Sequence, residues 1–295
     1  MWFCFLYIIS ITMGLSSVSP LWLWASMEVG LIMILYSLFV KSMHSGSLFE
    51  YFILQGLSSL GLISGILHNL VVVVALSLVL KLGLFPCLGW VYRVMSGVWC
   101  LDGVVYVMGF QKLLPLYVLS LSFVDSWGVW FVLVFGVVTM IVGVAQMLVS
   151  GSILWVFVSS SFVHSGWLSM LAVLNANWSW WLYLMVYILI IVIMGLSLFS
   201  GEGVWGISSL LLLMAMPPLL GFIMKVVSLM SVSWVGQGLI VFMGVVGFVS
   251  VVGYLGVSYS MLMNPNVGFN MISGFMYSLC LFVLMLLSVV LIVIL

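Results

Sequence analysis

Charged side chains are almost absent from this chain. Lysine, arginine, aspartate and glutamate together make up 3% of its 295 residues, and 67% of the residues are hydrophobic, whereas about a quarter of an ordinary soluble domain is charged. None of these four residue types occurs between Asp125 and Glu202, or from Val226 to Leu295. Each stretch can hold several apolar spans of about 20 residues. The scarcity of charge excludes an ordinary soluble fold and predicts that most of the chain lies in lipid.

The chain also lacks an excess of either charge. Five basic residues balance five acidic residues, so the formal net charge is zero. Because it has no basic patch or acidic tail, nucleic-acid binding is excluded. Four cysteines occur without the C-x-x-C spacing of a metal or redox site, so we interpret them as packing residues and predict neither a metal site nor a disulfide. They are Cys4, Cys87, Cys100 and Cys280.

No import leader precedes the first apolar run. The chain opens directly into WFCFLYIISITMGL at 2–15, without an Arg-rich or Ser-rich transit segment and without a basic start and small-residue cleavage site. We therefore expect the first helix to be retained. So apolar a chain without a leader is typical of synthesis inside the organelle or bacterium whose membrane it occupies.

What the chain has instead is a series of long apolar runs, separated by Gly, Ser, Pro, Asn and the few charges. These breaks predict eleven membrane spans of the length that a hydrocarbon core requires. We expect helices, because runs such as Leu70 to Leu80 lack the alternating polarity of a barrel strand. The predicted spans are 2–18, 21–40, 48–67, 70–90, 99–123, 127–148, 152–174, 178–199, 204–232, 237–257 and 271–295.

The basic loops predict the orientation. Lys41 follows the second span and Arg93 the fourth, so both loops lie on the face of the N-terminus, which the positive-inside rule assigns to the matrix or cytoplasm. Eleven spans would bring the C-terminus out on the opposite face. Small residues at helix-contact spacing, such as Gly61 and Gly65, predict that neighbouring helices pack closely.

Four charges lie inside the predicted spans and away from the span ends. Glu28, Lys81 and Lys112 are each near the middle of a span, and Lys225 lies in the ninth. A charge at a helix centre costs roughly 2.5 to 3.5 kcal/mol on insertion scales, so the four imply a penalty on the order of 10 kcal/mol if unpaired. Because the protonation of a buried group depends on its neighbours, these residues are candidates for a proton relay. The alternative is a static ion pair between Glu28 and one lysine that fixes helix register, but one carboxylate cannot neutralise three lysines.

Prolines accompany two of these lysines. Lys81 begins KLGLFP, with Pro86 downstream, and Lys225 ends MPPLLGFIMK, with Pro217 and Pro218 upstream. Proline removes an intrahelical hydrogen bond, and the freed carbonyls survive at membrane depth only inside protein or beside a wet cavity. Both spans are therefore predicted to be broken helices, and the reversed order of proline and lysine predicts an inverted repeat. The expected units are residues 1–125 and 126–258, followed by a C-terminal transmembrane helix at 268–295.

A histidine lies among hydroxyl groups in the seventh span. The string SSSFVHSGW places Ser160, Ser161 and Ser165 on or beside the face of His164. Since histidine titrates near neutrality, this polar stripe could carry protons through water between the two lysine sites. A purely structural histidine is the alternative.

Six strings, in their order and spacing, resemble the antiporter-like membrane subunits of respiratory complex I, and among them the short mitochondrial chain 2 family. The likeness runs from about residue 15 to residue 230. The strings are WLWASMEVG at 22–30, EYFILQ at 50–55, KLGLFPCLGW at 81–90, GFQKLLP at 109–115, SSSFVHSGW at 159–167 and MPPLLGFIMK at 216–225.

The resemblance implies a role for each buried charge. Glu28 would pair with Lys81 of the first broken helix, Lys112 would be the connecting lysine, and Lys225 would belong to the second broken helix. It also implies an all-α polytopic transmembrane helix bundle, in which a fourteen-helix fold has lost its first three helices. Our independent count of eleven spans agrees.

The resemblance further implies a core membrane-arm subunit of an H⁺-translocating NADH:ubiquinone reductase, in the mitochondrial inner membrane with the N-terminus on the matrix side. The chain would do no redox chemistry and bind no cofactor itself. NAD, FMN, iron-sulfur clusters and ubiquinone would be bound by other subunits. Its partners would be the other membrane-arm subunits and membrane lipids, including cardiolipin.

The sequence departs from the family's pattern at three places, one of which is Met214-Ala215-Met216, where Gly-Gly usually precedes the double proline. Cys87 and Leu88 stand where a histidine usually follows the first broken helix, and Leu154 and Trp155 replace a basic pair before the seventh-span histidine. These changes bear on loop packing and on a matrix-side contact. From residue 235 onward the match fades, so the last helices are predicted from hydropathy alone.

The resulting hypothesis is a relay of protons along the buried charges. Quinone reduction elsewhere would shift the pairing of Glu28 with Lys81 and pass protons through Lys112 and His164 toward Lys225. Moving one charge against the membrane potential costs about 2.3 kcal/mol per 100 mV, which is comparable with making and breaking one buried ion pair. The alternatives are a freestanding cation/proton antiporter and a structural spacer whose charges only specify assembly.

Overall fold

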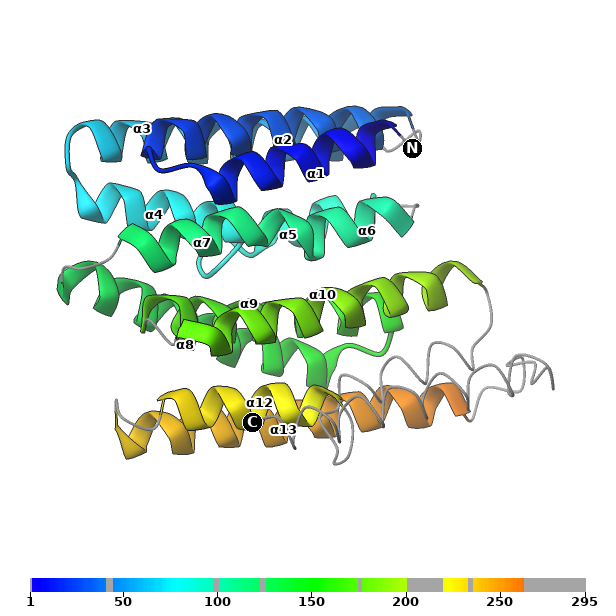
Figure 1. Cartoon of the computed structure of the whole chain (residues 1–295). Helices are drawn as coiled ribbons and strands as arrows, with labels where there is room; N and C mark the ends of the chain where they lie inside the picture. Colours follow the sequence, from blue (N-terminus) through cyan, green and yellow to red (C-terminus); the bar gives the residue numbers. More distant parts are fainter. Residues whose placement is uncertain are drawn as a thin grey trace. The chain divides into compact units, whose positions relative to one another are not determined.

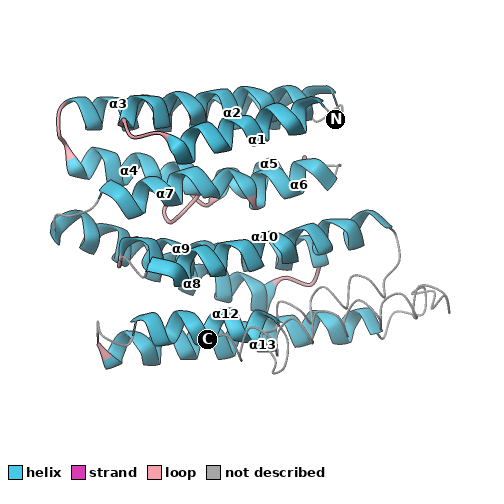
Figure 2. Cartoon of the chain, in the orientation of Figure 1, coloured by secondary structure: helices cyan, strands magenta, loops and turns pink. Residues whose placement is uncertain are grey.

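The fold is built from helices. The computed structural model describes residues 2–40, 45–97, 101–122, 126–174, 177–200, 220–232 and 236–262 (Figure 1). Figure 2 shows helices joined by loops, and no strand occurs among these described residues. The predicted all-α fold is therefore confirmed. The α-helices are α1 (Trp2–Ser16), α2 (Pro20–Val40), α3 (Ser45–Leu67), α4 (Val71–Leu82), α5 (Gly89–Ser96), α6 (Leu101–Met108), α7 (Leu113–Ser122), α8 (Ser126–Val149), α9 (Ile153–Val173), α10 (Asn177–Ser200), α12 (Leu220–Val232) and α13 (Gln237–Leu262).

Most of the predicted spans are present as apolar helices. Within the described residues, seven helical stretches are long and apolar enough to cross a bilayer, and three shorter apolar helices match predicted spans one, four and nine. Large apolar side chains such as Phe39, Leu60 and Phe248 are more than half exposed on the helix surfaces, an arrangement that lipid favours and water does not. The chain is therefore a multi-pass membrane protein. The eleventh predicted span, 271–295, lies outside the described residues.

The chain forms two compact units. Residues 1–140 and 165–175 make up the first unit, and residues 141–164 and 176–295 make up the second. In the first unit, α2 packs between α1 and α3, and α4 packs against both α3 and α7. In the second unit, α12 packs against both α10 and α13. The inverted-repeat division expected from the sequence stays a prediction.

Two glycines of α3 allow α4 to approach closely. A Cβ atom added to Gly65 would lie 2.8 Å from Val74 Cγ2 and 2.9 Å from the Val74 backbone nitrogen, and one added to Gly61 would lie 3.3 Å from Ser77 Cβ. The predicted close packing at these positions is confirmed. It holds the helix that carries Lys81 directly against α3.

The fourth predicted span is broken after Leu82, as expected. Gly83 adopts the left-handed conformation, with φ 67° and ψ 41°. The backbone N–H of Gly83 donates to the Leu80 carbonyl at 3.2 Å, and that of Leu84 donates to the Val79 carbonyl at 2.9 Å. This pair of bonds is the Schellman motif that ends many helices. A Cβ atom at Gly83 would also lie 2.6 Å from a Val91 methyl. Both the left-handed backbone and the lack of space therefore require glycine at this position.

The fifth predicted span is interrupted as well, which we did not predict. Helix α6 ends at Met108, a single 3₁₀ turn follows at Phe110–Lys112 (η1), and α7 begins at Leu113. Pro115 has no N–H to donate to the carbonyl of Gln111, four residues earlier, so a regular helix cannot run through this point. The tighter turn that results presents Gln111 and Lys112 at an irregular position inside the span.

Candidate functional site

Glu28 and Lys81 lie together in the first unit. Glu28 is in the middle of α2 and Lys81 is in the last turn of α4, and Lys81 Nζ lies 3.6 Å from Glu28 Oε1. The lysine side chain is 4% exposed and the glutamate side chain 25% exposed. The distance is that of an ion pair without a direct hydrogen bond. The lysine therefore has a counter-charge that a small movement of either side chain would strengthen or weaken.

The end of α4 is held by polar side chains from neighbouring helices. Gln55 Nε2 of α3 donates to the Lys81 carbonyl at 3.4 Å, and Trp90 Nε1 of α5 donates to the Leu80 carbonyl at 3.2 Å. The rings of Trp90 and Tyr51 lie 5.9 Å apart. Carbonyls freed by the helix break thus find donors inside the protein, as lipid requires. The sequence analysis did not identify Gln55 or Tyr51 as site residues. Their spacing of four residues in an apolar span places them on one helix face and could have indicated a polar site.

Lys112 lies in the same unit as this ion pair. It is the last residue of η1, a turn that contacts α4, and its side chain is buried with 6% exposure. The interruption of the fifth span therefore places a second buried lysine on an element that packs against the helix of Lys81.

In the second unit, His164 is bonded to a tyrosine. His164 Nδ1 and the Tyr183 hydroxyl are 2.8 Å apart, and both side chains are buried. The ring of Tyr187 lies 5.0 Å from the histidine ring, and its hydroxyl hydrogen-bonds with Ser161. The predicted polar stripe is thus lined by two tyrosines of α10. The sequence analysis did not identify these tyrosines, although their spacing of four residues places them on one face of the helix.

Lys225 also has a hydroxyl partner in the second unit. Its Nζ donates to Ser250 Oγ of α13 at 3.2 Å, and the lysine is 7% exposed. Tyr254 lies one turn further along α13 on the same face, and its hydroxyl hydrogen-bonds with Ser160. Polar side chains therefore extend from Lys225 along α13 to the serine stripe that carries His164. Pro217 and Pro218 lie outside the described residues.

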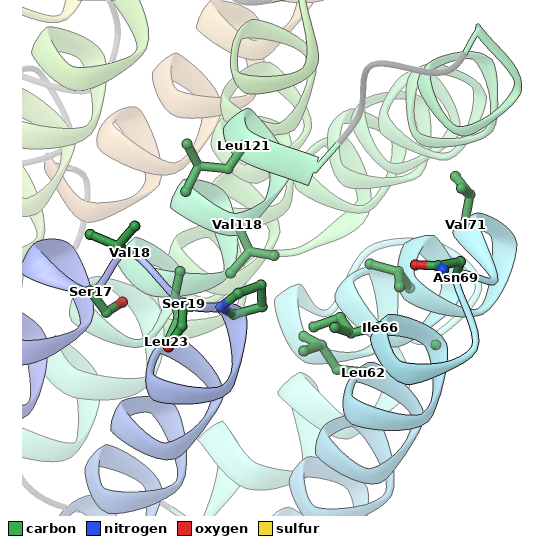
Figure 3. Close-up of a pocket in the computed structure, with 13 residues that line it drawn as sticks. Ser17, Val18, Ser19, Leu23, Leu62, Ile66, Asn69, Val71, Val118 and Leu121 are labelled. Atoms are coloured by element: carbon green, nitrogen blue, oxygen red, sulfur yellow. The ribbon is translucent and has the colours of Figure 1, made fainter.

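A cavity in the first unit lies away from all of these groups. It has a volume of about 500 Å³ and lies where the loop between α1 and α2 meets the ends of α3, α4 and α7. Figure 3 shows Ser17, Leu62, Asn69, Val118 and Leu121 around it. None of its lining residues titrates, so it offers no group that can take up or release a proton.

The sequence is similar to known membrane subunits of one enzyme. It is 29% identical over 178 residues to NADH-ubiquinone oxidoreductase chain 2 of Anopheles gambiae, a match that covers 55% of this chain and 50% of the relative. It is 27% identical over 262 residues to the chain 2 protein of Locusta migratoria, covering 77% of this chain and 75% of that one. The chain thus spans about half the length of the mosquito relative. No family model matches the sequence.

The fold is shared with subunits of two large membrane assemblies. A chain of respiratory complex I from Thermus thermophilus superposes with a TM-score of 0.78 at 17% identity, covering 97% of this chain and 77% of that one. A chain of the Mrp complex from Dietzia gives a TM-score of 0.76 at 14% identity, covering 86% of this chain and 59% of that one. Sequence relatives and fold together confirm the resemblance of this chain to the antiporter-like membrane subunits of complex I, and among them to chain 2.

Proposed function

We propose that the chain is a core membrane-arm subunit of respiratory complex I, and that it couples NADH oxidation and ubiquinone reduction elsewhere in the complex to proton translocation. The observation that carries the proposal is the burial of three lysines in helices that lie in the membrane: Lys81, Lys112 and Lys225 are each less than 8% exposed. A structural helix bundle needs no such residues, whose burial is costly. A proton pump requires groups of this kind within the membrane.

The ion pair in the first unit would act as the input of the pump. Because the protonation of Lys81 depends on the charge and distance of Glu28, a shift of Glu28 changes the readiness of Lys81 to release a proton. Two unit charges 4 Å apart interact by about 4 kcal/mol at an effective dielectric constant of 20. Moving one charge across 100 mV takes about 2.3 kcal/mol. Making and breaking such a pair therefore supplies energy of the required size.

The remaining buried groups would pass protons onward. Lys112 lies on the turn that contacts α4, His164 is hydrogen-bonded to Tyr183, and Lys225 donates to Ser250. Hydroxyl groups and an imidazole can accept one proton while donating another. In this proposal Lys225 is the terminal group of the relay and His164 is an intermediate.

The test is proton pumping by the assembled complex in sealed vesicles. In Lys225→Gln and Glu28→Gln variants, the number of protons moved per NADH oxidised should fall, because each change removes a charge from the relay. Arg93→Gln is a matched control, since this basic side chain is 67% exposed and its partner is Glu50. Unchanged pumping in both test variants would remove these residues from the relay.

The setting of the chain is part of the proposal. We place it in the mitochondrial inner membrane with its N-terminus on the matrix side, beside other membrane-arm subunits and lipids that include cardiolipin. In this proposal, NAD, FMN, iron-sulfur clusters and ubiquinone are bound by other subunits. Co-purification with a flavin- and iron-sulfur-containing NADH-oxidising assembly tests the partners. An N-terminal epitope that antibodies reach in intact mitoplasts would contradict the orientation.

A freestanding cation/proton antiporter is the second candidate, favoured by the fold shared with a chain of the Mrp complex. The two functions differ in what the isolated chain can do. An antiporter reconstituted alone should acidify or alkalinise vesicles when a sodium gradient is applied. A membrane-arm subunit should show no such exchange without the rest of the complex.

A further inference from the structure

The cavity of the first unit has an apolar floor and a polar rim. Ser17 and Ser19 of the loop between α1 and α2 lie on one side of the rim, and Asn69 at the end of α3 lies on the other (Figure 3). The floor lies at least one helical turn further from the helix ends, and its side chains are aliphatic and less than 8% exposed. They are Leu23, Leu62, Val74 and Val118. A ligand that fits this lining has an apolar body and a polar end.

The rim lies at the level of a membrane interface. Helices α1, α3 and α7 end there, α2 and α4 begin there, and α8 begins on the same face directly after α7. Three tryptophans mark this end of the unit: Trp22 near the start of α2 is 65% exposed, and Trp127 and Trp130 near the start of α8 are 83% and 66% exposed. Tryptophan is enriched where lipid meets water. The polar rim is therefore level with lipid headgroups, and the apolar floor with their acyl chains.

The size of the cavity fits one acyl chain. Its volume is about 500 Å³, within the range of sites that hold small apolar ligands. A methylene group is about as large as a water molecule, which takes up about 30 Å³, so the space holds a chain of roughly 16 methylene groups. A membrane-spanning helix is about 10 Å wide and 30 Å long and occupies several times this volume. A helix of a neighbouring subunit is therefore too large to be the occupant.

The rim offers hydrogen-bond donors without a charge. The Ser19 hydroxyl accepts from the Trp22 N–H at 3.4 Å, and its own O–H can donate to a ligand. Asn69 has a left-handed backbone with φ 54°, fixed where the Leu70 N–H donates to the Gly65 carbonyl at 2.8 Å, and its amide carries two N–H donors. The ester carbonyls of a phospholipid are acceptors at this depth. Because no residue that lines the cavity is charged, a headgroup with a net negative charge finds no counter-charge here.

We propose that this cavity binds one acyl chain of a phospholipid without net charge, whose ester carbonyls accept hydrogen bonds from Ser19 and Asn69. The proposal needs only that the chain lies in a membrane, and it is independent of the proton relay. The bound chain would pack against α2, α3, α4 and α7 at once. An unfilled space would deprive the lining side chains of those contacts, so the lipid would act as a part of the helix packing.

Photolabelling in the native membrane tests the site. A phosphatidylcholine with a diazirine in its acyl chain is added to the membranes and activated before any detergent, and the labelled peptides of the assembled protein are mapped by mass spectrometry. We expect label on α4 and α7 around Val74 and Val118. Ile66→Trp fills the cavity and should remove this label. Leu60→Trp is the matched control, because the same change is made in α3 at a position that is 67% exposed and does not line the cavity.

A second variant tests the rim without changing the volume of the floor. Asn69→Gly keeps the left-handed backbone and removes the amide, so labelling should fall about fivefold, the effect of losing about one hydrogen bond. Equal labelling in Ile66→Trp and Leu60→Trp would mean that the lipid only surrounds the helices, and the proposal would be wrong. Stronger labelling by a photoactivatable cardiolipin than by phosphatidylcholine would also overturn it. So would a high-resolution map of the assembly in which side chains of another subunit fill the cavity.

Discussion

The buried lysines of the two units have different partners. In the first unit Lys81 faces the carboxylate of Glu28 at 3.6 Å, whereas in the second unit Lys225 donates to the hydroxyl of Ser250 at 3.2 Å. The described residues of the second unit contain no aspartate or glutamate at all. A carboxylate can change charge, and a serine hydroxyl cannot within the ordinary pH range. In the proposed relay, the first unit would therefore act as the switch, and the second would pass protons on.

The two lysines also occupy different parts of their helices. Lys81 is in the last turn of α4, where the negative end of the helix dipole favours a cation, while Lys225 is in the first half of α12 as the structure describes it. This difference agrees with the reversed order of proline and lysine in the sequence. Lys81 thus has two sources of negative potential, and Lys225 relies on neutral dipoles.

Removing the carboxylate should have the largest effect. Glu28→Gln leaves Lys81 buried without its counter-charge, and breaking a buried pair in this way costs about 3 kcal/mol, the lower end of the usual range, because Glu28 is partly exposed. The loss should be seen in chemical unfolding of the chain in detergent, followed by circular dichroism. In the double variant Glu28→Gln/Lys81→Met much of it should be recovered. Simple addition of the two single effects would show that the residues do not interact.

Disturbing the end of α4 should rank second. Gly83→Ala forces a side chain into a left-handed conformation and against Val91, which should cost about 2 kcal/mol. Gly56→Ala is the control, because this helical glycine of α3 has open space around it, and alanine should stabilise it slightly. Thermal unfolding in detergent compares the two. Equal melting temperatures would mean that the helix break is not constrained at Gly83.

The hydroxyl partner of Lys225 should matter less than the carboxylate of Lys81. Ser250→Ala removes one hydrogen bond to a charged group, worth about 1.5 kcal/mol. Ser258→Ala in the same helix is the control, because the Ser258 hydroxyl bonds only its own helix at Leu255. Both the stability and the pumping rate should fall in the first variant alone. If Ser250→Ala destabilised the chain as much as Glu28→Gln does, the hydroxyl partner of Lys225 would matter as much as the carboxylate partner of Lys81, and the proposed difference between the units would be wrong.

The smallest effect is expected at the histidine. Tyr183→Phe keeps the aromatic ring and removes the 2.8 Å contact with His164 Nδ1, a loss of about 1 kcal/mol. The pumping rate of the assembled complex should fall several-fold as its pH dependence changes, because the hydroxyl no longer bonds the ring. Tyr36→Phe is the control, because Tyr36 of α2 is 50% exposed. A pH profile identical to that of the unmodified complex would support a purely structural histidine.

Much of the helical framework could be predicted from the sequence. In a membrane the backbone must satisfy its own hydrogen bonds, so long apolar runs leave no alternative to a helix. The sequence also predicts the helix break after Lys81. The prediction was based on Pro86, whereas the structure shows that Gly83 ends the helix. The interruption at Pro115 was missed, because a proline in the first turn of a helix and one inside a helix look the same in sequence.

The partners of the buried charges could be predicted only in part. The pairing of Glu28 with Lys81 was implied by the resemblance and is present. Ser250 could not be identified as the partner of Lys225, since serines are common in these spans and most of them bond their own helix. Tyr51 and Gln55 both belong to α3, and their contacts with Trp90 and the Lys81 carbonyl are decided by how α3 packs against α4 and α5.

The close glycine contact between α3 and α4 restricts sliding of the helices but leaves side chains free to rotate. With the backbone of Val74 against Gly65, α4 cannot slide without a collective rearrangement, which takes microseconds to milliseconds, while side chains rotate in picoseconds to nanoseconds. Charge can therefore be redistributed around Lys81 while the helices stay in register. In the proposed relay, the packed helices would stay fixed while side chains and protons move between them.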